Sequence, residues 1–159
     1  MSRVVVTMTV NGEEMTAEAL VRSTLLDLIR DGFGLTGTHA GCEQGACGAC
    51  SVMLDGKLVR SCLVLAVAAA GQSVTTIEGI GRPDSLSPIQ QAMVDHHGLQ
   101  CGFCTPGMVM SALDVLSRPG PLAEREVREA LAGNLCRCTG YTGIISAVME
   151  VAERQAGLP

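Results

Sequence analysis

The chain has 159 residues, of which 47% are apolar, so it can bury a core and does not belong to the disordered or low-complexity classes. The net charge is −5 at pH 7, and the 11 basic residues are scattered, which argues against nucleic-acid binding in a basic groove. The longest aliphatic run, Leu63–Ala70, is far shorter than the ~20 residues of a membrane-spanning helix. The first residues do not resemble a secretory leader, so we expect no membrane span and a cytoplasmic location.

The first half of the chain is predicted to form strand pairs around one helix. Asn11-Gly12 and Asp55-Gly56 are typical hairpin turns, and apolar residues alternate with polar ones beside them. Ser23 is expected to cap a short helix over residues 24–31. The predicted strands cover residues 4–10, 13–17, 51–54, 57–61 and 74–77. Strand pairs around a single helix indicate a compact α+β domain.

The second half is predicted to be helical. Ser87-Pro88 and Thr105-Pro106 each combine a capping residue with a first-turn proline. Charged residues at helical spacing over 124–129 indicate a solvated helix face. The predicted helices cover residues 88–97, 105–117, 123–132 and 143–155, as expected for a small bundle. We therefore expect a first domain over 1–78, a linker over 79–83 and a second domain over 84–159.

Eight cysteines dominate the possible chemistry of the chain. In a reducing compartment, this number of cysteines favours metal binding over disulfides, although the count alone leaves disulfides, zinc and iron open. Their spacing divides them into two sets of four. The first set is Cys42, Cys47, Cys50 and Cys62, and the second set is Cys101, Cys104, Cys136 and Cys138.

The first set has the Cys-x4-Cys-x2-Cys spacing of plant-type ferredoxins, followed by a distant fourth cysteine. Three thiolates must converge on one small anionic cluster, so the loop has to turn tightly. Gly41, Gly45 and Gly48 allow such turns and let backbone N–H groups approach the sulfur atoms. The fourth ligand, Cys62, is expected at the end of a neighbouring strand. The spacing strongly favours one [2Fe–2S] cluster over four structural cysteines.

The second set pairs Cys-x2-Cys with Cys-x-Cys, and each pair lies beside a predicted helix start. Helix N-termini favour thiolates through exposed N–H groups and the helix dipole, so this set predicts a second [2Fe–2S] site. A four-cysteine zinc site stays open, because tetrahedral sulfur ligation suits both metals. A redox pair formed by Cys101 and Cys104 is disfavoured because no βαβ unit is predicted, and disulfides remain a minor alternative.

The remaining candidate residues have ordinary explanations. His39, His96 and His97 lack ligand spacing and are expected to be surface or capping residues. Methionines at apolar helical positions are expected to pack in the core. The sequence contains no nucleophile–base constellation, no phosphate-binding glycine loop and no nucleotide fingerprint. The chain is therefore expected to transfer electrons without carrying out substrate chemistry of its own.

Taken together, the two motifs resemble the iron–sulfur sites of the molybdenum hydroxylases, the xanthine dehydrogenase and aldehyde oxidoreductase family. The resemblance covers nearly the whole chain. A separate chain of this length resembles the small subunit of bacterial three-subunit members. It is carried by residues 37–50 (GTHAGCEQGACGAC), 100–107 (QCGFCTPG) and 134–141 (NLCRCTGY).

The resemblance implies a β-grasp ferredoxin-like domain followed by a four-helix [2Fe–2S]-binding bundle. It implies a large subunit with molybdopterin, commonly the cytosine dinucleotide form, and a medium subunit with FAD, in a dimer of heterotrimers. Electrons would pass from molybdenum through the helical-domain cluster and then the ferredoxin-like cluster to FAD. Gln100 matches the glutamine that hydrogen-bonds the pterin, and Cys138 matches the cluster ligand nearest the pterin amino group.

Two classes of function are compatible with these residues. The first is an electron-transfer subunit held in a molybdenum hydroxylase, and the second is a free-standing two-cluster ferredoxin. The mean hydropathy of +0.34 favours the bound subunit, because apolar surface on a chain without a membrane segment indicates a partner. Substrate contacts in this family lie on the large subunit, so the substrate is not encoded in this chain.

Overall fold

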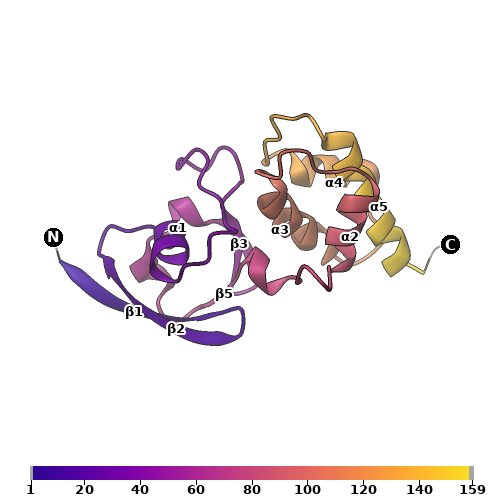
Figure 1. Ribbon diagram of the computed structural model, residues 1–159. Helices are drawn as coiled ribbons and strands as arrows, with labels where there is room; N and C mark the ends of the chain where they lie inside the picture. Colours follow the sequence, from indigo (N-terminus) through magenta and orange to yellow (C-terminus); the bar gives the residue numbers. More distant parts are fainter. Residues whose placement is uncertain (1, 158–159) are drawn as a thin grey trace.

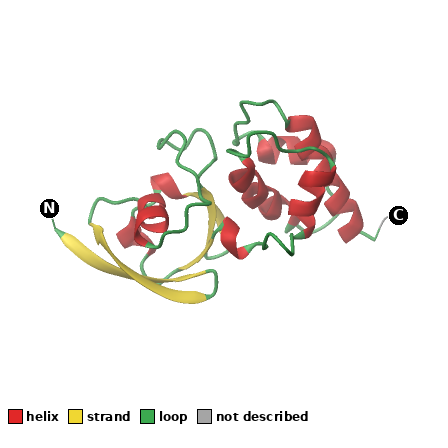
Figure 2. Ribbon diagram, in the orientation of Figure 1, coloured by secondary structure: helices red, strands yellow, loops and turns green. Residues whose placement is uncertain are grey.

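The computed structural model describes residues 2–157 and has a sheet half and a helical half lying side by side (Figure 1). All five strands lie in the first half, and the four longer helices lie in the second (Figure 2). Met1 and residues 158–159, which end the second predicted domain, lie outside the described residues. No helix within residues 2–157 is both long enough and apolar enough to cross a membrane. The predicted α+β class is confirmed.

The sheet half contains one mixed five-stranded sheet with the strand order β2-β1-β5-β3-β4. The β1–β2 and β3–β4 hairpins form at the two predicted turns, and β5 lies between them, parallel to β1 and antiparallel to β3. The central position of β5 joins the two hairpins into one sheet. The strands are β1 Arg3–Val10, β2 Glu13–Leu20, β3 Ser51–Leu54, β4 Lys57–Arg60 and β5 Ser73–Thr75.

The alternation along β1 separates the core from solvent. Val6, Met8 and Val10 are buried, whereas Val5 is 67% exposed. Because successive side chains of a strand point to opposite faces, one face of the sheet packs on the core. The predicted last strand was placed too late: β5 ends at Thr75, and a 3₁₀ turn begins at Ile77.

The short helix against this sheet starts one residue later than predicted. Thr24 caps α1 (Leu25–Asp27): its hydroxyl accepts from the Asp27 N–H (3.1 Å), and the Asp27 carboxylate accepts from the Thr24 N–H (2.8 Å). Ser23 is held elsewhere, because its carbonyl accepts from the Ala66 N–H at 2.9 Å. After α1 the chain widens into a π-helical turn, Leu28–Gly32. The predicted cap at Ser23 is therefore wrong, although the helix itself is present.

The helical half forms where four helices were predicted, with α5 beginning slightly before residue 143. Ser87 caps the first helix together with Gln90, as its sequence signal indicated. Met93 and Met108 are buried in the core that the four helices share, which confirms the predicted role of the methionines. The helices are α2 Pro88–Asp95, α3 Thr105–Leu116, α4 Glu124–Leu131 and α5 Tyr141–Gln155.

Candidate metal centres

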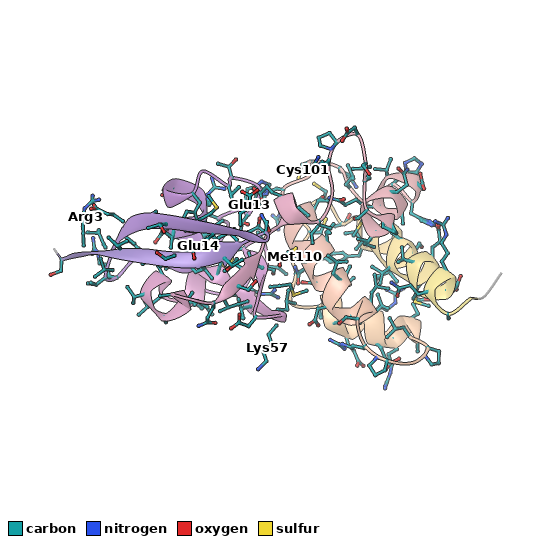
Figure 3. All side chains as sticks on the ribbon, turned by 90° about the horizontal axis from the view of Figure 1, so that it is seen from below. Arg3, Glu13, Glu14, Lys57, Cys101 and Met110 are labelled. Carbon is teal, nitrogen blue, oxygen red and sulfur yellow. The ribbon has the colours of Figure 1, made fainter. Side chains whose placement is uncertain are left out.

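Both sets of cysteines lie near the boundary between the two halves. The loop before β3 and the two loops that precede α3 and α5 project to the same side of the molecule (Figure 1). Figure 3 places Cys101 near this boundary, whereas Arg3 lies at the far end of the sheet half. The fold therefore gathers two distant stretches of sequence into two neighbouring cysteine sites.

In the first site, Cys42, Cys47 and Cys50 lie on the loop before β3. Cys62 lies in a 3₁₀ turn directly after β4, close to the predicted strand end. Cys50 and Cys62 are buried and pack against Leu26 of α1. Helix α1 thus holds the buried side of the site in place, while Cys42 and Cys47 remain partly accessible.

The electrostatic environment of these thiols is uneven. Backbone N–H groups, first that of Gln44 and then that of Cys47, lower the pKa of Cys42 to about 7. The Cys47 N–H lies 3.3 Å from the Cys42 sulfur. Burial, followed by the neighbouring Cys50 thiol, raises the pKa of Cys62 to about 11. Hydrogen bonds to sulfur favour the thiolate that a metal requires, and burial keeps water away from the same site.

Two glycines are required by this loop geometry. Gly48 has a φ of +76°, and a Cβ there would lie 2.7 Å from the Gly133 carbonyl oxygen. A Cβ on Gly41 would lie 2.9 Å from the Cys47 sulfur. The predicted need for glycines around the sulfur atoms is therefore met by specific close approaches.

The second site is built at two helix starts. Cys104 is the N-cap residue of α3, and Cys136 and Cys138 precede α5. The Phe103 N–H, followed by the Cys138 side chain, lowers the pKa of Cys101, whereas burial raises the pKa of Cys104 to about 12. The Gly140 N–H, at the start of α5, lies 3.3 Å from the Cys136 sulfur. The start of α5 thus supplies an N–H group to sulfur, as expected, whereas at the start of α3 burial outweighs this effect for Cys104.

The donor sets of the two sites distinguish between the metals that the sequence left open. All eight cysteines are free thiols. They interact in pairs, so that each site contains two pairs: Cys42 with Cys47, Cys50 with Cys62, Cys101 with Cys138, and Cys104 with Cys136. Among residues 2–157, no three His, Cys, Asp or Glu side chains are grouped closely enough to hold one metal ion. Two pairs per site fit a two-iron centre, in which each iron takes two thiolates.

The two sites are joined directly through the backbone. The Leu135 N–H donates to the Cys47 carbonyl at 2.8 Å, linking a residue beside Cys136 to a residue of the first site. Helix α3 packs so closely on the first loop that a Cβ on Gly107 would lie 2.2 Å from the Gly48 carbonyl oxygen. The sites therefore have a fixed mutual position.

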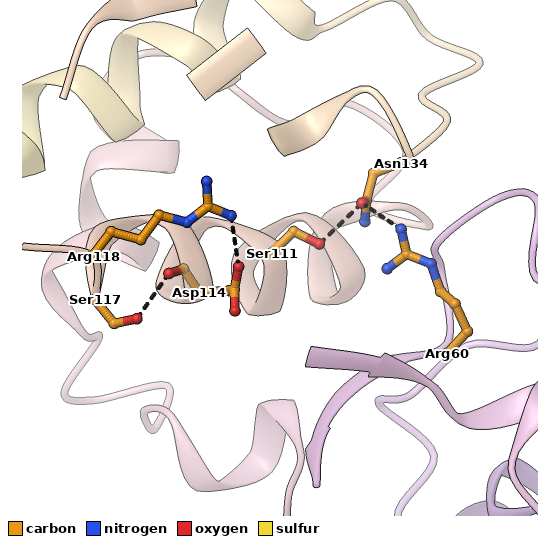
Figure 4. Close-up of polar contacts among 6 residues, drawn as sticks. All are labelled: Arg60, Ser111, Asp114, Ser117, Arg118 and Asn134. Atoms are coloured by element: carbon orange, nitrogen blue, oxygen red, sulfur yellow. Dashed lines mark hydrogen bonds and ion pairs between the residues drawn. The ribbon is translucent and has the colours of Figure 1, made fainter. Parts of the chain in front are cut away.

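A polar cluster reinforces this contact (Figure 4). Asn134 is 2% exposed; its Oδ1 accepts from the Ser111 hydroxyl (2.9 Å) and from the Arg60 guanidinium (3.2 Å), and its Nδ2 donates to the Gly48 carbonyl (3.3 Å). Arg60 also donates to the Gly133 carbonyl at 2.9 Å. These residues were not singled out from the sequence, because isolated polar residues at a strand end and in a loop carry no periodic signal.

Two of the three histidines, His39 and His96, have partners that spacing did not reveal. The His39 Nδ1 lies 2.7 Å from the Phe103 carbonyl, and the two rings stack with centroids 4.9 Å apart. His39 thus joins the first cysteine loop to the second, rather than serving as a simple surface residue. His96 caps the end of α2, as expected of a capping residue, and also pairs with Glu150 of α5.

Gln100, the glutamine expected at the pterin, lies beside the second site. Its Nε2 donates to the Cys138 carbonyl at 3.0 Å, and the side chain is exposed to solvent. The structure therefore brings Gln100 and Cys138 together at the surface.

Comparisons with known proteins agree with this geometry. Residues 8–75 match the 2Fe-2S iron-sulfur cluster binding domain, and residues 76–149 match the [2Fe-2S] binding domain. The caffeine dehydrogenase subunit gamma of Pseudomonas sp. (strain CBB1) is 46% identical over 155 residues, which cover 96% of this chain and 93% of the relative. The nicotine 6-hydroxylase small subunit of Paenarthrobacter nicotinovorans is 50% identical over 149 residues, which cover 93% and 89%.

A solved structure has the same fold along the whole chain. Quinoline 2-oxidoreductase from Pseudomonas putida 86 superposes with a TM-score of 0.92 at 44% identity, covering 97% of this chain and 95% of that one. The resemblance noted from the sequence is thereby confirmed. The chain belongs to the family of small iron–sulfur electron-transfer subunits of the molybdenum hydroxylases.

Proposed function

We propose that this chain relays electrons from a molybdopterin centre on a large subunit to FAD on a medium subunit. The observation that carries the proposal is the arrangement of the cysteines as two paired sets, joined by the hydrogen bond from Leu135 to Cys47. Two metal sites in contact, without a substrate-reacting group beside them, suit a relay. The direction, from the second site to the first, follows from the family resemblance.

The proposed ligands are the two cysteine sets. Residues 1–78 would form a β-grasp ferredoxin-like domain that holds the first cluster, and residues 84–159 a four-helix bundle that holds the second, with 79–83 as the linker. The ligands of the first cluster are Cys42, Cys47, Cys50 and Cys62, and those of the second are Cys101, Cys104, Cys136 and Cys138.

When bound, each [2Fe–2S] cluster supplies one-electron redox chemistry, with a potential set by net charge, hydrogen bonds to sulfur and exposure. The chain provides hydrogen bonds to sulfur and burial unevenly within each site. N–H groups favour the thiolates of Cys42 and Cys101, whereas burial encloses Cys62 and Cys104. The close packing of α3 on the first loop fixes the separation of the sites.

At the molybdenum side, Gln100 and Cys138 would contact the pterin, in the cytosine dinucleotide form that the family resemblance implies, and Cys138 would receive the electrons. The hydrogen bond from Gln100 to the Cys138 carbonyl supports this assignment, because it holds both residues at the same exposed point. Substitution of Cys138 by Ser should slow transfer from molybdenum to flavin while substrate still binds. Normal transfer in that variant would refute the assigned role.

Exposed apolar side chains beside both sites support partner subunits. Leu63 (64% exposed) borders the first site, and Phe103 and Leu135 (49% and 57%) border the second. Apolar groups that surround a redox site and face solvent are typical of surfaces that a partner covers. We propose docking to the medium subunit at the first site and to the large subunit at the second, in a cytoplasmic dimer of heterotrimers. The alternative is a free two-cluster ferredoxin.

The proposal is tested first by the metal content. Purified protein should carry about four iron and four acid-labile sulfide per chain, and its reduced form should show two distinct paramagnetic [2Fe–2S] signals. Substitution of Cys50 by Ser and of Cys104 by Ser should each remove a different one of the two signals. Zinc in place of iron would overturn the cluster assignment. Co-purification from the native cell then decides the partner: recovery with molybdenum and flavin subunits supports the complex, whereas elution alone supports the free carrier.

A further inference from the structure

Arg60 ends β4 and reaches into the boundary between the two cysteine sites. Its guanidinium donates to the Ser51 hydroxyl, to the Gly133 carbonyl at 2.9 Å and to the Asn134 Oδ1 at 3.2 Å. Ser51 directly follows Cys50 of the first site, and Gly133 and Asn134 lead into Cys136 of the second. Arg60 itself is two residues before Cys62. One side chain therefore contacts the chain around both sites.

Within residues 2–157, the charge of Arg60 has no carboxylate partner. Its three hydrogen-bond acceptors are a hydroxyl, a backbone carbonyl and a side-chain amide, all of which are neutral. The six ion pairs found within residues 2–157 do not include Arg60. Its side chain is half-buried, and its partners Ser51 and Asn134 are each 2% exposed.

A half-buried positive charge is costly unless an opposite charge lies nearby. The groups at this boundary that become negative are the cysteine sulfur atoms, since metal ligation requires thiolates. Four thiolates outweigh the positive charge of a two-iron core, so each occupied site would carry net negative charge. Arg60 is a cation that the chain holds at the boundary between these two anionic sites.

We propose that Arg60 raises the reduction potentials of both [2Fe–2S] centres by placing a fixed positive charge between them. This inference rests on the proposed function, because it requires both centres to be present. Reduction of either centre adds one electron and hence one negative charge, which the guanidinium stabilises. Arg60 acts as a positioning residue with a fixed charge, and it does not itself accept electrons.

The geometry explains why arginine serves here rather than lysine. The planar guanidinium reaches three acceptors at once, and Gly133 leaves room for it, since a Cβ there would lie 2.8 Å from the Arg60 Nη2. The neutral partners hold the charge without cancelling it. Asn134 is important in this respect, because an aspartate in its place would put a carboxylate against the guanidinium.

The test compares midpoint potentials of the two centres, measured by EPR-monitored redox titration of the holoprotein. Arg60→Gln should lower both potentials, with a change of about tenfold in each reduction equilibrium, or about 59 mV for one electron. Arg60→Lys, which keeps the charge, should leave both potentials close to those of the unsubstituted protein. The shift in Arg60→Gln should be equal at about pH 6 and about pH 8, as expected of the fixed charge that guanidinium groups carry in proteins. Arg125→Gln, on the exposed face of α4, is the matched control and should change neither potential.

Each outcome decides the proposal. Unchanged potentials in Arg60→Gln, or equal shifts in Arg60→Gln and Arg60→Lys, would overturn it and leave Arg60 a purely structural contact. If Arg60→Gln does not fold, Arg60→Met decides, because it removes the charge and keeps a long side chain: potentials that fall support the fixed charge, and unchanged potentials refute it. Iron and sulfide in the unsubstituted protein test the proposed function separately, so failure of the one is distinguishable from failure of the other.

Discussion

The Leu135 N–H donates to the Cys47 carbonyl at 2.8 Å, so the two cysteine sites share a backbone hydrogen bond across the boundary between the sheet and helical halves. Leu135 precedes Cys136 of the second site, and Cys47 belongs to the first. A contact between backbone groups does not depend on the flexibility of a side chain. The distance between the sites is therefore set by the packing of the two halves.

Replacement of Gly107 by Ala should destabilise the protein. A Cβ at this position would lie 2.2 Å from the Gly48 carbonyl oxygen and 3.0 Å from the Ala49 Cα, which are both backbone atoms of the first loop. Because neither atom can move without the loop, α3 must shift, at a cost of about 1–3 kcal/mol. Calorimetric unfolding of the holoprotein measures the effect.

Gly140→Ala provides the matched control. Gly140 has a φ of −73°, and the nearest atom to an added Cβ would be 3.7 Å away, which is an ordinary contact. This variant should unfold close to the wild-type temperature. A Gly107→Ala protein as stable as Gly140→Ala would contradict the close packing of α3 on the loop.

Asn134→Ala should loosen the contact between the halves. The change leaves the buried Ser111 hydroxyl without its partner and removes an acceptor from Arg60. An unsatisfied buried polar group costs about 1–3 kcal/mol, and urea unfolding of the holoprotein measures it. Ser111→Ala, which removes one hydrogen bond and leaves Asn134 joined to Arg60, should cost less. Equal costs in the two variants would show that Asn134 does not act as the centre of the cluster.

The thiols of iron-free protein should alkylate in a fixed order. The pKa of Cys42 is about 7, so its thiolate forms as the pH rises through about 7 and reacts with iodoacetamide under neutral conditions. The pKa of Cys104 is about 12, so it stays protonated and unreactive over the same range. Mass-spectrometric mapping between about pH 6 and about pH 9 follows both sites. Alkylation of Cys104 before Cys42 would contradict these environments.

Gln100→Ala should slow reduction of flavin by substrate in the assembled complex. The change removes the hydrogen bond to the Cys138 carbonyl and the proposed contact with the pterin. Loss of such an outer hydrogen bond lowers activity roughly tenfold, while substrate binding should be unaffected. Stopped-flow kinetics give the rate, and the half-saturating substrate concentration gives the binding.

Gln72→Ala is the control for that experiment. Gln72 makes the same kind of contact, from its Nε2 to the Ala68 carbonyl at 2.8 Å, but lies in the sheet half. It should leave the rate unchanged. A Gln100→Ala complex that transfers electrons as fast as the Gln72→Ala complex would remove Gln100 from the electron route.

Local signals in the sequence predicted most elements of this fold. The alternation along β1, the two hairpin turns and the Ser87 cap depend on near neighbours, and each formed where expected. The cap at Ser23 failed because a distant residue, Ala66, binds the Ser23 carbonyl. The place of β5 between the hairpins likewise depends on residues far apart in the chain.

The candidate sites were predictable in part for the same reason. The cysteines fall in closely spaced groups along the sequence, at 42–50, 101–104 and 136–138, and their glycines and helix starts are local signals. The joining of the two sites by His39, Arg60 and Asn134 was not predictable, because each looks like an ordinary polar residue until its partner in the other half is known. Contacts between two separately folded cores leave no periodic pattern in either.

The approach of Gly107 to the Gly48 carbonyl also limits how this chain can be re-engineered or recombined. A ferredoxin-like half taken from another protein would contact α3 through a different loop. A helical half with any side chain at position 107 would in turn be held away from the loop around Gly48. Exchange of either half alone would therefore disturb the neighbouring redox site as well as its own. For the purpose of grafting, the unit that can be transplanted intact is the pair of halves together.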